Sequence, residues 1–304
     1  MHTQQQDFIQ FEHLDLLAKQ VVDGFIIGLH KSPYHGFSVE FAEHRLYNAG
    51  DSIKGIDWKV FARSEKLYIK KFEEETNLRC QIILDASSSM YFPQERVNNK
   101  PNKIEFSCLA AAAIMHMLKI QRDAVGLTVF DTKVNLQTPA KSNALHHQFL
   151  LNELYKTIND KTKNKTTNAA KCIHQIADAI HKRSLVIIFS DMLDDLDEQE
   201  IFLALQHLKH NKHEVILFHV TDKAKEIEFN FENRPYEFID METGETLKLQ
   251  PNQVKELYIN KMFERNNNLK LKCAQYKIDL IEADINEGFK TVLMAYLAKR
   301  NKML

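Results

Sequence analysis

Oxygen-bearing side chains recur at regular spacing in the segment QIILDASSSM, residues 81–90. Asp85, Ser87 and Ser89 are separated by single residues and come directly after the apolar run Ile82–Leu84. An apolar run that ends in polar groups is typical of a buried strand that delivers them at its carboxyl end. One carboxylate and two hydroxyls suit a hard cation such as Mg²⁺, which prefers oxygen ligands. A strand followed by a serine-rich turn explains the same string without any ligand.

Two further segments could bring oxygen ligands to the same place. The apolar run Leu185–Phe189 is followed by a serine and then by Asp191, so a second carboxylate stands at the end of a second predicted strand. Thr166 and Thr167 follow a lysine-rich loop, where a helix is predicted to begin. Polar groups at the carboxyl ends of parallel strands converge at one edge of a sheet. The predicted site therefore comprises Asp85, Ser87, Ser89, Thr167 and Asp191.

The elements that must position these groups follow from the hydrophobic pattern. Apolar runs predict strands at residues 82–84, 124–130, 134–137, 185–189, 215–220 and 278–281. Helical periodicity predicts helices at residues 103–120, 145–158, 168–181, 197–209, 251–275 and 288–298. Repeated strand–helix alternation predicts an α/β fold with a doubly wound, mostly parallel sheet. Residues 229–249 read as a hairpin-like insertion.

The amino-terminal part has a different pattern. Residues 11–30 carry apolar side chains at helical spacing, and residues 34–79 combine turn signals with short alternating runs. We therefore predict an amino-terminal helix and a small β-rich accessory layer over residues 1–79, followed by the main α/β domain over residues 80–304. Trp58 stands in the accessory layer, where plain packing and a binding role are both compatible with the sequence.

Composition limits the class of partner. The chain has 304 residues and a net charge of −1, so no global positive field argues for nucleic acid or for an anionic membrane surface. The four cysteines form no CxxC pair, which indicates reduced thiols and a cytoplasmic protein. No signal peptide is expected at the amino terminus, and no apolar stretch is long enough to span a bilayer.

A histidine-rich segment, HLKHNKH at residues 207–213, invites a metal interpretation. His207, His210 and His213 alternate there with lysines at the end of a predicted helix. This pattern favours the solvated carboxyl-terminal face of a helix over a set of metal ligands.

The order of the predicted site residues resembles the metal-ion-dependent adhesion site of von Willebrand factor A domains. That site consists of a D-x-S-x-S loop, then a threonine, then an aspartate after a central strand. The resemblance runs from about residue 81 to the end of the chain and implies a bound Mg²⁺ ion, with Mn²⁺ or Ca²⁺ as alternatives. Thr166 is the alternative to Thr167, which the family pattern favours because Asn168 follows it directly.

A second resemblance covers nearly the whole chain. The block ahead of the site is similar to the signature of the bacterial DUF58 family, R-x-Y-x-x-G-D-x-x-x-x-I-D-W followed by A-R and K-x-F-x-E. The matching residues are Arg45, Tyr47, Gly50, Asp51, Ile56, Asp57, Trp58, Ala62, Arg63, Lys70, Phe72 and Glu74. Many members have amino-terminal membrane helices, whereas this chain is expected to be soluble. Its possible second interaction surface consists of Arg45, Asp51, Asp57, Trp58 and Arg63.

These resemblances imply a non-enzymatic, metal-dependent protein-interaction module. The hydroxyls of Ser87, Ser89 and Thr167 would bind the ion directly, while Asp85 and Asp191 would hold its water ligands. Because neutral ligands leave the cation under-neutralised, it would seek a carboxylate from a partner protein. The DUF58 resemblance implies that this partner is a MoxR-type AAA+ ATPase, in a chaperone-like or complex-assembly role.

Two other functions remain compatible with the residues. Asp85, Asp191 and Mg²⁺ could serve a phosphoesterase-like hydrolysis, although no general base is tied to the site. The site could also be vestigial on a stable fold. A serine hydrolase is disfavoured because no G-x-S-x-G motif is present, and the chain has no phosphate-binding loop of an ATPase.

Overall fold

The computed structural model describes residues 14–26, 44–46, 63, 68–70, 78–94, 100–160, 168–192 and 198–303. The chain forms two compact units, one of Met1–Phe25 with Leu78–Met303 and one of Ile26–Asn77. In the second unit, β1 (His44–Leu46) pairs antiparallel with β2 (Tyr68–Lys70). The predicted β-rich segment thus contains a small antiparallel sheet.

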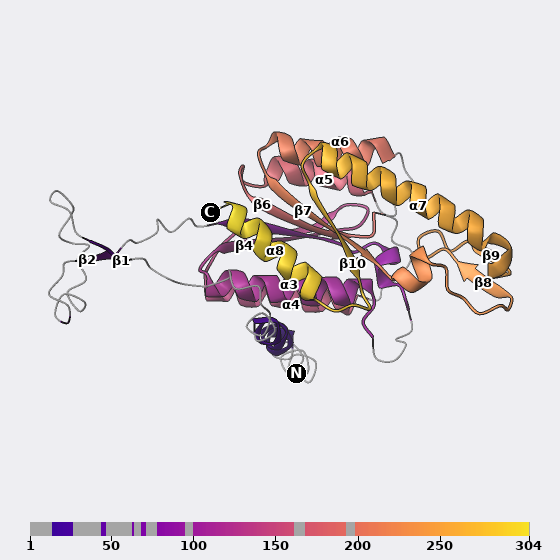
Figure 1. The fold of residues 1–304 in the computed structure, drawn as a ribbon, viewed down its shortest axis with the longest axis horizontal. Coiled ribbons are helices and arrows are strands. Elements are labelled where there is room, and N and C mark those ends of the chain that lie inside the picture. The colour runs from indigo at the N-terminus through magenta and orange to yellow at the C-terminus, as the bar shows by residue number, and fades with distance from the viewer. Residues whose placement is uncertain are drawn as a thin grey trace. The chain divides into compact units, whose positions relative to one another are not determined.

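A six-stranded sheet forms the centre of the first unit, in the order β10-β7-β6-β3-β4-β5 (Figure 1). All neighbouring strands are parallel except β4 and β5, which pair antiparallel. This is the strand order 3-2-1-4-5-6 of doubly wound folds, and it confirms the predicted α/β fold with a doubly wound, mostly parallel sheet. The strands are β3 (Arg79–Asp85), β4 (Ala124–Phe130), β5 (Val134–Gln137), β6 (Leu185–Ser190), β7 (Glu214–Thr221) and β10 (Asp279–Asp284).

Helices cover both faces of this sheet (Figure 1). On one face lie α5 (Ala169–Ala179), α6 (Glu198–His210) and α7 (Pro251–Gln275), and on the other lie α3 (Lys103–Ile120), α4 (Ala144–Ile158) and α8 (Lys290–Met303). Strands β3 and β6 are therefore buried along almost their whole length, which explains their continuous apolar sequence. Two short helical turns complete the site region, η2 (Ser88–Tyr91) and η3 (Lys223–Ile227).

The helix α3 begins at a capping box. The Asn102 side chain accepts a hydrogen bond from the backbone of Glu105 at 2.9 Å, and the Glu105 carboxylate accepts one from the backbone of Asn102 at 3.2 Å. Its residues Ala110–Ala113 are fully buried, because small side chains let the helix approach the sheet closely. The position of the first residue, Lys103, is thereby fixed.

Two additions flank the α/β core. The amino-terminal helix, residues 14–26, buries Leu14, Ala18 and Val22 at a spacing of four residues. Between η3 and α7, β8 (Tyr236–Ile239) and β9 (Thr246–Leu249) form an antiparallel hairpin. Its turn contains Gly244 at φ 77°, a left-handed conformation that glycine adopts without strain.

The variant Gly126→Ala should destabilise the chain by about 2 kcal/mol or more, because an added Cβ would overpack the core. That atom would overlap the Oε1 atom of Gln81 and lie 2.7 Å from the carbonyl oxygen of Thr138. Gln81 cannot simply move away, since its buried amide donates to Thr128 Oγ1 at 2.9 Å. Chemical denaturation measures the loss. The matched control is Gly24→Ala, where nothing lies within 4 Å and helix propensity predicts a small gain.

Acidification from pH 6.5 to 4 should destabilise the chain partly through His147. This side chain is buried, and burial followed by the charge of Lys119 lowers its pKa to about 4. As the pH falls through 6.5, the unfolded chain binds a proton at this histidine, whereas the folded chain does not. The contribution of neutral His147 to stability is therefore fully present above pH 6.5 and is lost progressively below it. The loss is on the order of 2 kcal/mol. His147→Leu should flatten this part of the pH–stability curve, whereas the exposed control His210→Leu should leave it unchanged.

Candidate functional site

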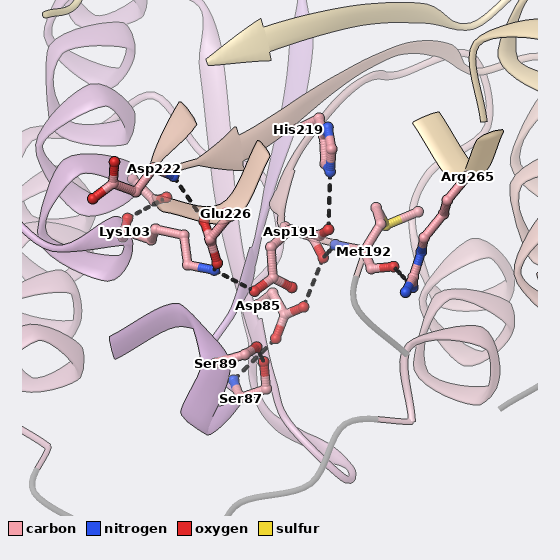
Figure 2. A network of polar contacts seen from close by, with 12 residues as sticks. Asp85, Ser87, Ser89, Lys103, Asp191, Met192, His219, Asp222, Glu226 and Arg265 are labelled. Atoms are coloured by element: carbon pink, nitrogen blue, oxygen red, sulfur yellow. Dashed lines mark hydrogen bonds and ion pairs between the residues drawn. The ribbon is translucent and has the colours of Figure 1, made fainter. Parts of the chain in front are cut away.

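The carboxylate of Asp85 lies between two loops at the carboxyl ends of neighbouring strands (Figure 2). Asp85 is the last residue of β3, and its Oδ1 atom accepts a hydrogen bond from the backbone N–H of Ser87 at 2.9 Å. Its Oδ2 atom accepts one from the hydroxyl of Ser190, the last residue of β6, at 2.7 Å. The β3 loop and the β6 loop are thereby tied together through one buried carboxylate.

The two loop serines present their hydroxyls side by side. The Oγ atoms of Ser87 and Ser89 are 3.1 Å apart, and Ser87 is fully buried. The chain can bring them together because η2 starts at Ser88 and coils the backbone back immediately after the strand. Asp85, Ser87 and Ser89 therefore form one group of oxygen atoms (Figure 2).

Asp191 contacts a lysine that is completely buried. Its Oδ2 atom lies 2.7 Å from the Nζ atom of Lys103, whose side chain is 0% exposed. The same ammonium lies 2.5 Å from Oε1 of Glu226, a residue of η3. Figure 2 shows Lys103 between the two carboxylates, with Asp85 beside Asp191. The ammonium group of Lys103 thus connects the loop after β6 to the turn after β7.

The carboxylate of Glu226 is held in place from the other side. Its Oε2 atom accepts the backbone N–H of Asp222 at 2.7 Å, which closes η3 on itself. The Asp222 side chain in turn accepts the amide of Asn286 at 3.0 Å, from the loop after β10. The acidic partner of Lys103 is therefore held by contacts within the turn after β7, which is tied in turn to the loop after β10.

The backbone after Asp191 is strained and secured by two side chains. Met192 has a φ of 51°, a left-handed conformation that costs an unbranched L-residue on the order of 1 kcal/mol. Arg265 donates to the carbonyl oxygen of Met192 at 2.6 Å, and the Nε2 atom of His219 lies 3.0 Å from the carbonyl oxygen of Asp191. The same turn lets the Met192 N–H donate to Ser190 Oγ at 2.9 Å, so the strain serves to position the site.

The site concentrates negative charge on side chains that are largely buried. Burial, followed by the charge of Asp191, raises the pKa of Asp85 to about 6, against hydrogen bonds from Ser190 and Ser87 that lower it. Burial also raises the pKa of Glu226. Burial alone would lower the pKa of Lys103, but the carboxylates of Asp191 and Glu226 outweigh it and raise the pKa. When ionised, these three carboxylates and one ammonium leave two negative charges uncompensated.

This imbalance fits a divalent cation. The residues that would hold it are Asp85, Ser87, Ser89 and Asp191, which supply carboxylate and hydroxyl oxygens only, the ligands of Mg²⁺. In the described part of the chain no three His, Cys, Asp or Glu side chains are arranged to hold a metal ion, so a cation here depends on the serine hydroxyls. The donor chemistry agrees with the adhesion-site resemblance.

The structure brings together four of the five predicted site residues. Thr167, with its alternative Thr166, lies outside the described residues. The next residue, Asn168, caps α5 by accepting the N–H of Lys171 at 3.3 Å. Most of the predicted second interaction surface also lies outside the described residues, namely Asp51, Asp57, Trp58 and the side chain of Arg45. Its remaining member, Arg63, is exposed.

Sequence reasoning missed Lys103 and Glu226. The signal for Lys103 was a lysine at the first position of a helix, where the macrodipole disfavours a cation and an acidic partner is required. The interpretation of the histidine-rich segment was wrong for His213, which is buried and whose Nδ1 atom accepts the N–H of Ser184 at 3.2 Å. The segment ends in a turn before β7 in which Lys212 is exposed and only the last histidine is buried.

Solved structures similar to this chain share little sequence with it. The hypothetical protein BatB from Bacteroides thetaiotaomicron is 14% identical, with a TM-score of 0.45 over 74% of this chain and 98% of that one. An aerotolerance-related membrane protein from Bacteroides fragilis is 16% identical, with a TM-score of 0.44 over 74% and 99%. The SpRpn10 VWA domain is 14% identical, with a TM-score of 0.37 over 72% of this chain and 94% of that one.

In the part of the chain that the structure describes, no helix has the length and apolar character needed to cross a bilayer.

Sequence comparison gives a family. Uncharacterized proteins from Mycobacterium bovis and Mycobacterium tuberculosis are 24% identical over 209 residues, which covers 69% of this chain and 63% of each relative. The match thus spans less than two thirds of the length of these relatives. The family described as "Protein of unknown function DUF58" matches residues 43–268, about three quarters of the chain. The chain belongs to the DUF58 family.

Proposed function

We propose that this chain is a non-enzymatic docking module that binds an acidic residue of a partner protein through a divalent cation, with Mg²⁺ as the resident ion. The observation that carries the proposal is the group of oxygen atoms from Asp85, Ser87 and Ser89 beside the carboxylate of Asp191. When bound, the cation supplies a Lewis-acidic position for an anionic oxygen from outside. The chain itself supplies the ligands and keeps them in a fixed arrangement.

The surroundings of the site support binding rather than hydrolysis. His219 is the imidazole that contacts the Asp191 loop, and its Nε2 atom contacts a backbone carbonyl oxygen instead of facing the serines. Burial lowers the pKa of His219, so it is neutral and donates this hydrogen bond. Because the imidazole holds the loop, it is not placed to activate a water molecule as a general base.

The partner in this proposal is a MoxR-type AAA+ ATPase, and the place of action is the cytoplasm. The sequence signature of the DUF58 family supports the choice of ATPase. The four cysteines are unpaired and buried, which agrees with a reducing compartment. An acidic residue on the ATPase would provide the carboxylate that approaches the cation.

The test is a binding measurement between this chain and a purified MoxR-type ATPase from the same organism. Chelation alone does not decide the question, because the ATPase needs Mg²⁺ for its own nucleotide. Mg²⁺ is therefore kept constant, and wild type is compared with Asp85→Asn by surface-immobilised binding. We expect at least a 100-fold loss of affinity for Asp85→Asn, and a similar loss when one acidic residue of the ATPase is replaced by its amide.

The matched control for this comparison is Asp240→Asn, which removes an exposed carboxylate from the β8–β9 turn. It should bind like wild type. Equal affinity of Asp85→Asn and wild type for the ATPase would contradict docking through the cation. If hydrolysis of a phosphoester by the wild-type chain disappears in Asp85→Asn, the hydrolase alternative replaces the docking proposal.

A further inference from the structure

Two histidines face each other on the helices that cover one side of the sheet. His174 lies in the middle of α5 and His207 in the last turn of α6, and their Nδ1 atoms are 3.1 Å apart. Their ring centroids are 5.3 Å apart and the ring planes are tilted by 43°. Both side chains are partly exposed, so an ion from solvent can reach them. None of these atoms belongs to the strand-end site, which consists of Asp85, Ser87, Ser89 and Asp191.

A carboxylate lies against the other nitrogen of one ring. The Nε2 atom of His207 is 3.2 Å from Oδ1 of Asp178, one helical turn after His174 on α5. Asp178 therefore holds the proton of His207 on Nε2 and leaves a lone pair on Nδ1, directed toward His174. This is the carboxylate–histidine arrangement that orients and strengthens metal-binding imidazoles.

The distance between the two nitrogens suits a shared ion. Zn²⁺ binds histidine nitrogens at 2.0–2.1 Å, so two nitrogens 3.1 Å apart can share one ion at an angle of about 95–100°. Imidazole is a ligand that Zn²⁺, Ni²⁺ and Cu²⁺ accept, whereas Mg²⁺ prefers oxygen. From this geometry we propose that His174 and His207 form a two-histidine site for a divalent transition-metal ion such as Zn²⁺, with Asp178 as the positioning residue.

The helices provide a rigid frame for such a site. Residues on both sides of the histidines belong to the hydrophobic core, among them Ile173, Ile176, Leu205 and Leu208. Core packing rather than flexible loops therefore holds the two rings next to each other, so only side-chain rotation is needed to form the site. Without metal, a hydrogen bond from His174 Nδ1–H to His207 Nδ1 occupies the same pair of atoms, and the centroid distance of 5.3 Å shows that the two rings point at each other. Binding therefore requires that the His174 proton moves to Nε2 and that both rings turn until their Nδ1 lone pairs meet at the ion.

Zn²⁺ binding by the chelator-treated full chain tests the proposal. We expect one saturable Zn²⁺ site by calorimetry and a rise of roughly 5 °C in the unfolding midpoint at a 100-fold excess over Kd. His174→Ala and His207→Ala should each abolish this site, and Asp178→Asn should weaken it by about 10–100-fold. With Cu²⁺, the electron paramagnetic resonance spectrum should show two nitrogen ligands in wild type, and this two-nitrogen signal should be lost in each histidine variant.

Two controls separate this site from the rest of the chain. His210→Ala removes the exposed histidine one turn further along the same segment and should retain the Zn²⁺ site. Asp85→Asn should also retain it, since the strand-end site is chemically and spatially separate. If His174→Ala binds Zn²⁺ as wild type does, or if wild type shows no saturable site, the two rings form a hydrogen bond only and the proposal fails.

Discussion

Lys103→Met should lower the free energy of unfolding by about 3–5 kcal/mol in the absence of metal, the largest loss expected from any single substitution at the site. The change leaves the carboxylates of Asp191 and Glu226 without their shared ammonium, in a place where Lys103 itself is 0% exposed. A buried charge that loses its partner costs far more than the pair contributed, because water does not return to solvate it. Denaturant titration in a chelator measures the loss.

The matched control for this prediction is an exposed ion pair. Lys156 lies 2.6 Å from Glu153, but its side chain is 62% exposed, so Lys156→Met should change stability by less than about 0.5 kcal/mol. Adding Glu226→Gln to Lys103→Met should recover part of the loss, since one uncompensated charge is removed. A loss below 1 kcal/mol for Lys103→Met would show that Asp191 and Glu226 are solvated or neutral without it.

Asp85→Asn should make the metal-free chain more stable by about 1–3 kcal/mol at pH 7.5. The fold raises the pKa of Asp85 from 3.8 to about 6, through burial and then through the charge of Asp191. A raised carboxyl pKa contributes stability below pH 3.8, and that contribution is lost as the pH rises through about 6. The ionised side chain therefore costs most at neutral pH, where the amide removes the cost.

The pH dependence makes this second prediction specific. The gain from Asp85→Asn should be present at pH 7.5 and absent at pH 4, as measured by denaturation at both values. The control variant Asp240→Asn removes a carboxylate whose pKa is lowered by the fold instead of raised, because Asp240 accepts backbone hydrogen bonds from Thr243 and Glu242. It should give no gain at neutral pH. If Asp85→Asn instead destabilises the chain at pH 7.5, Asp85 is a structural anchor and the site is not kept for a cation.

Such a gain in stability would have a functional meaning. Natural chains keep charged groups that destabilise the fold where those groups bind something. Two adjacent carboxylates, Asp85 and Asp191, fit that description, and so does the left-handed backbone at Met192. The site stores an unfavourable charge arrangement that a divalent cation would relieve.

Much of this arrangement could be predicted from local sequence. The strand and helix patterns around Asp85 and Asp191 are strong, since β3 and β6 are buried on both faces and α3 has a capping box at its start. The boundaries of α3 and α7 were predicted to the residue. Parallel pairing of β3 with β6 then follows from strand–helix alternation, and it places both carboxylates at one edge.

The remainder depended on contacts between residues distant in sequence. Lys103 meets Glu226 across 123 positions, and Glu226 lies in a turn whose sequence has no regular pattern. The spacing of HLKHNKH could not show that His207 faces His174 of another helix, nor that His213 turns into the core. These pairs are set by how helices and loops pack, which periodicity does not encode.

The most direct test of the proposed site is calorimetric titration of chelator-treated chain with MgCl₂, wild type beside Asp85→Asn. We predict one saturable site per wild-type chain and none in Asp85→Asn, with both variants folded by circular dichroism. Mn²⁺ should bind the same site in wild type, and Asp85→Asn should abolish this binding as well. Absence of saturable binding in wild type, or equal binding in Asp85→Asn, would contradict a cation held by Asp85, Ser87, Ser89 and Asp191.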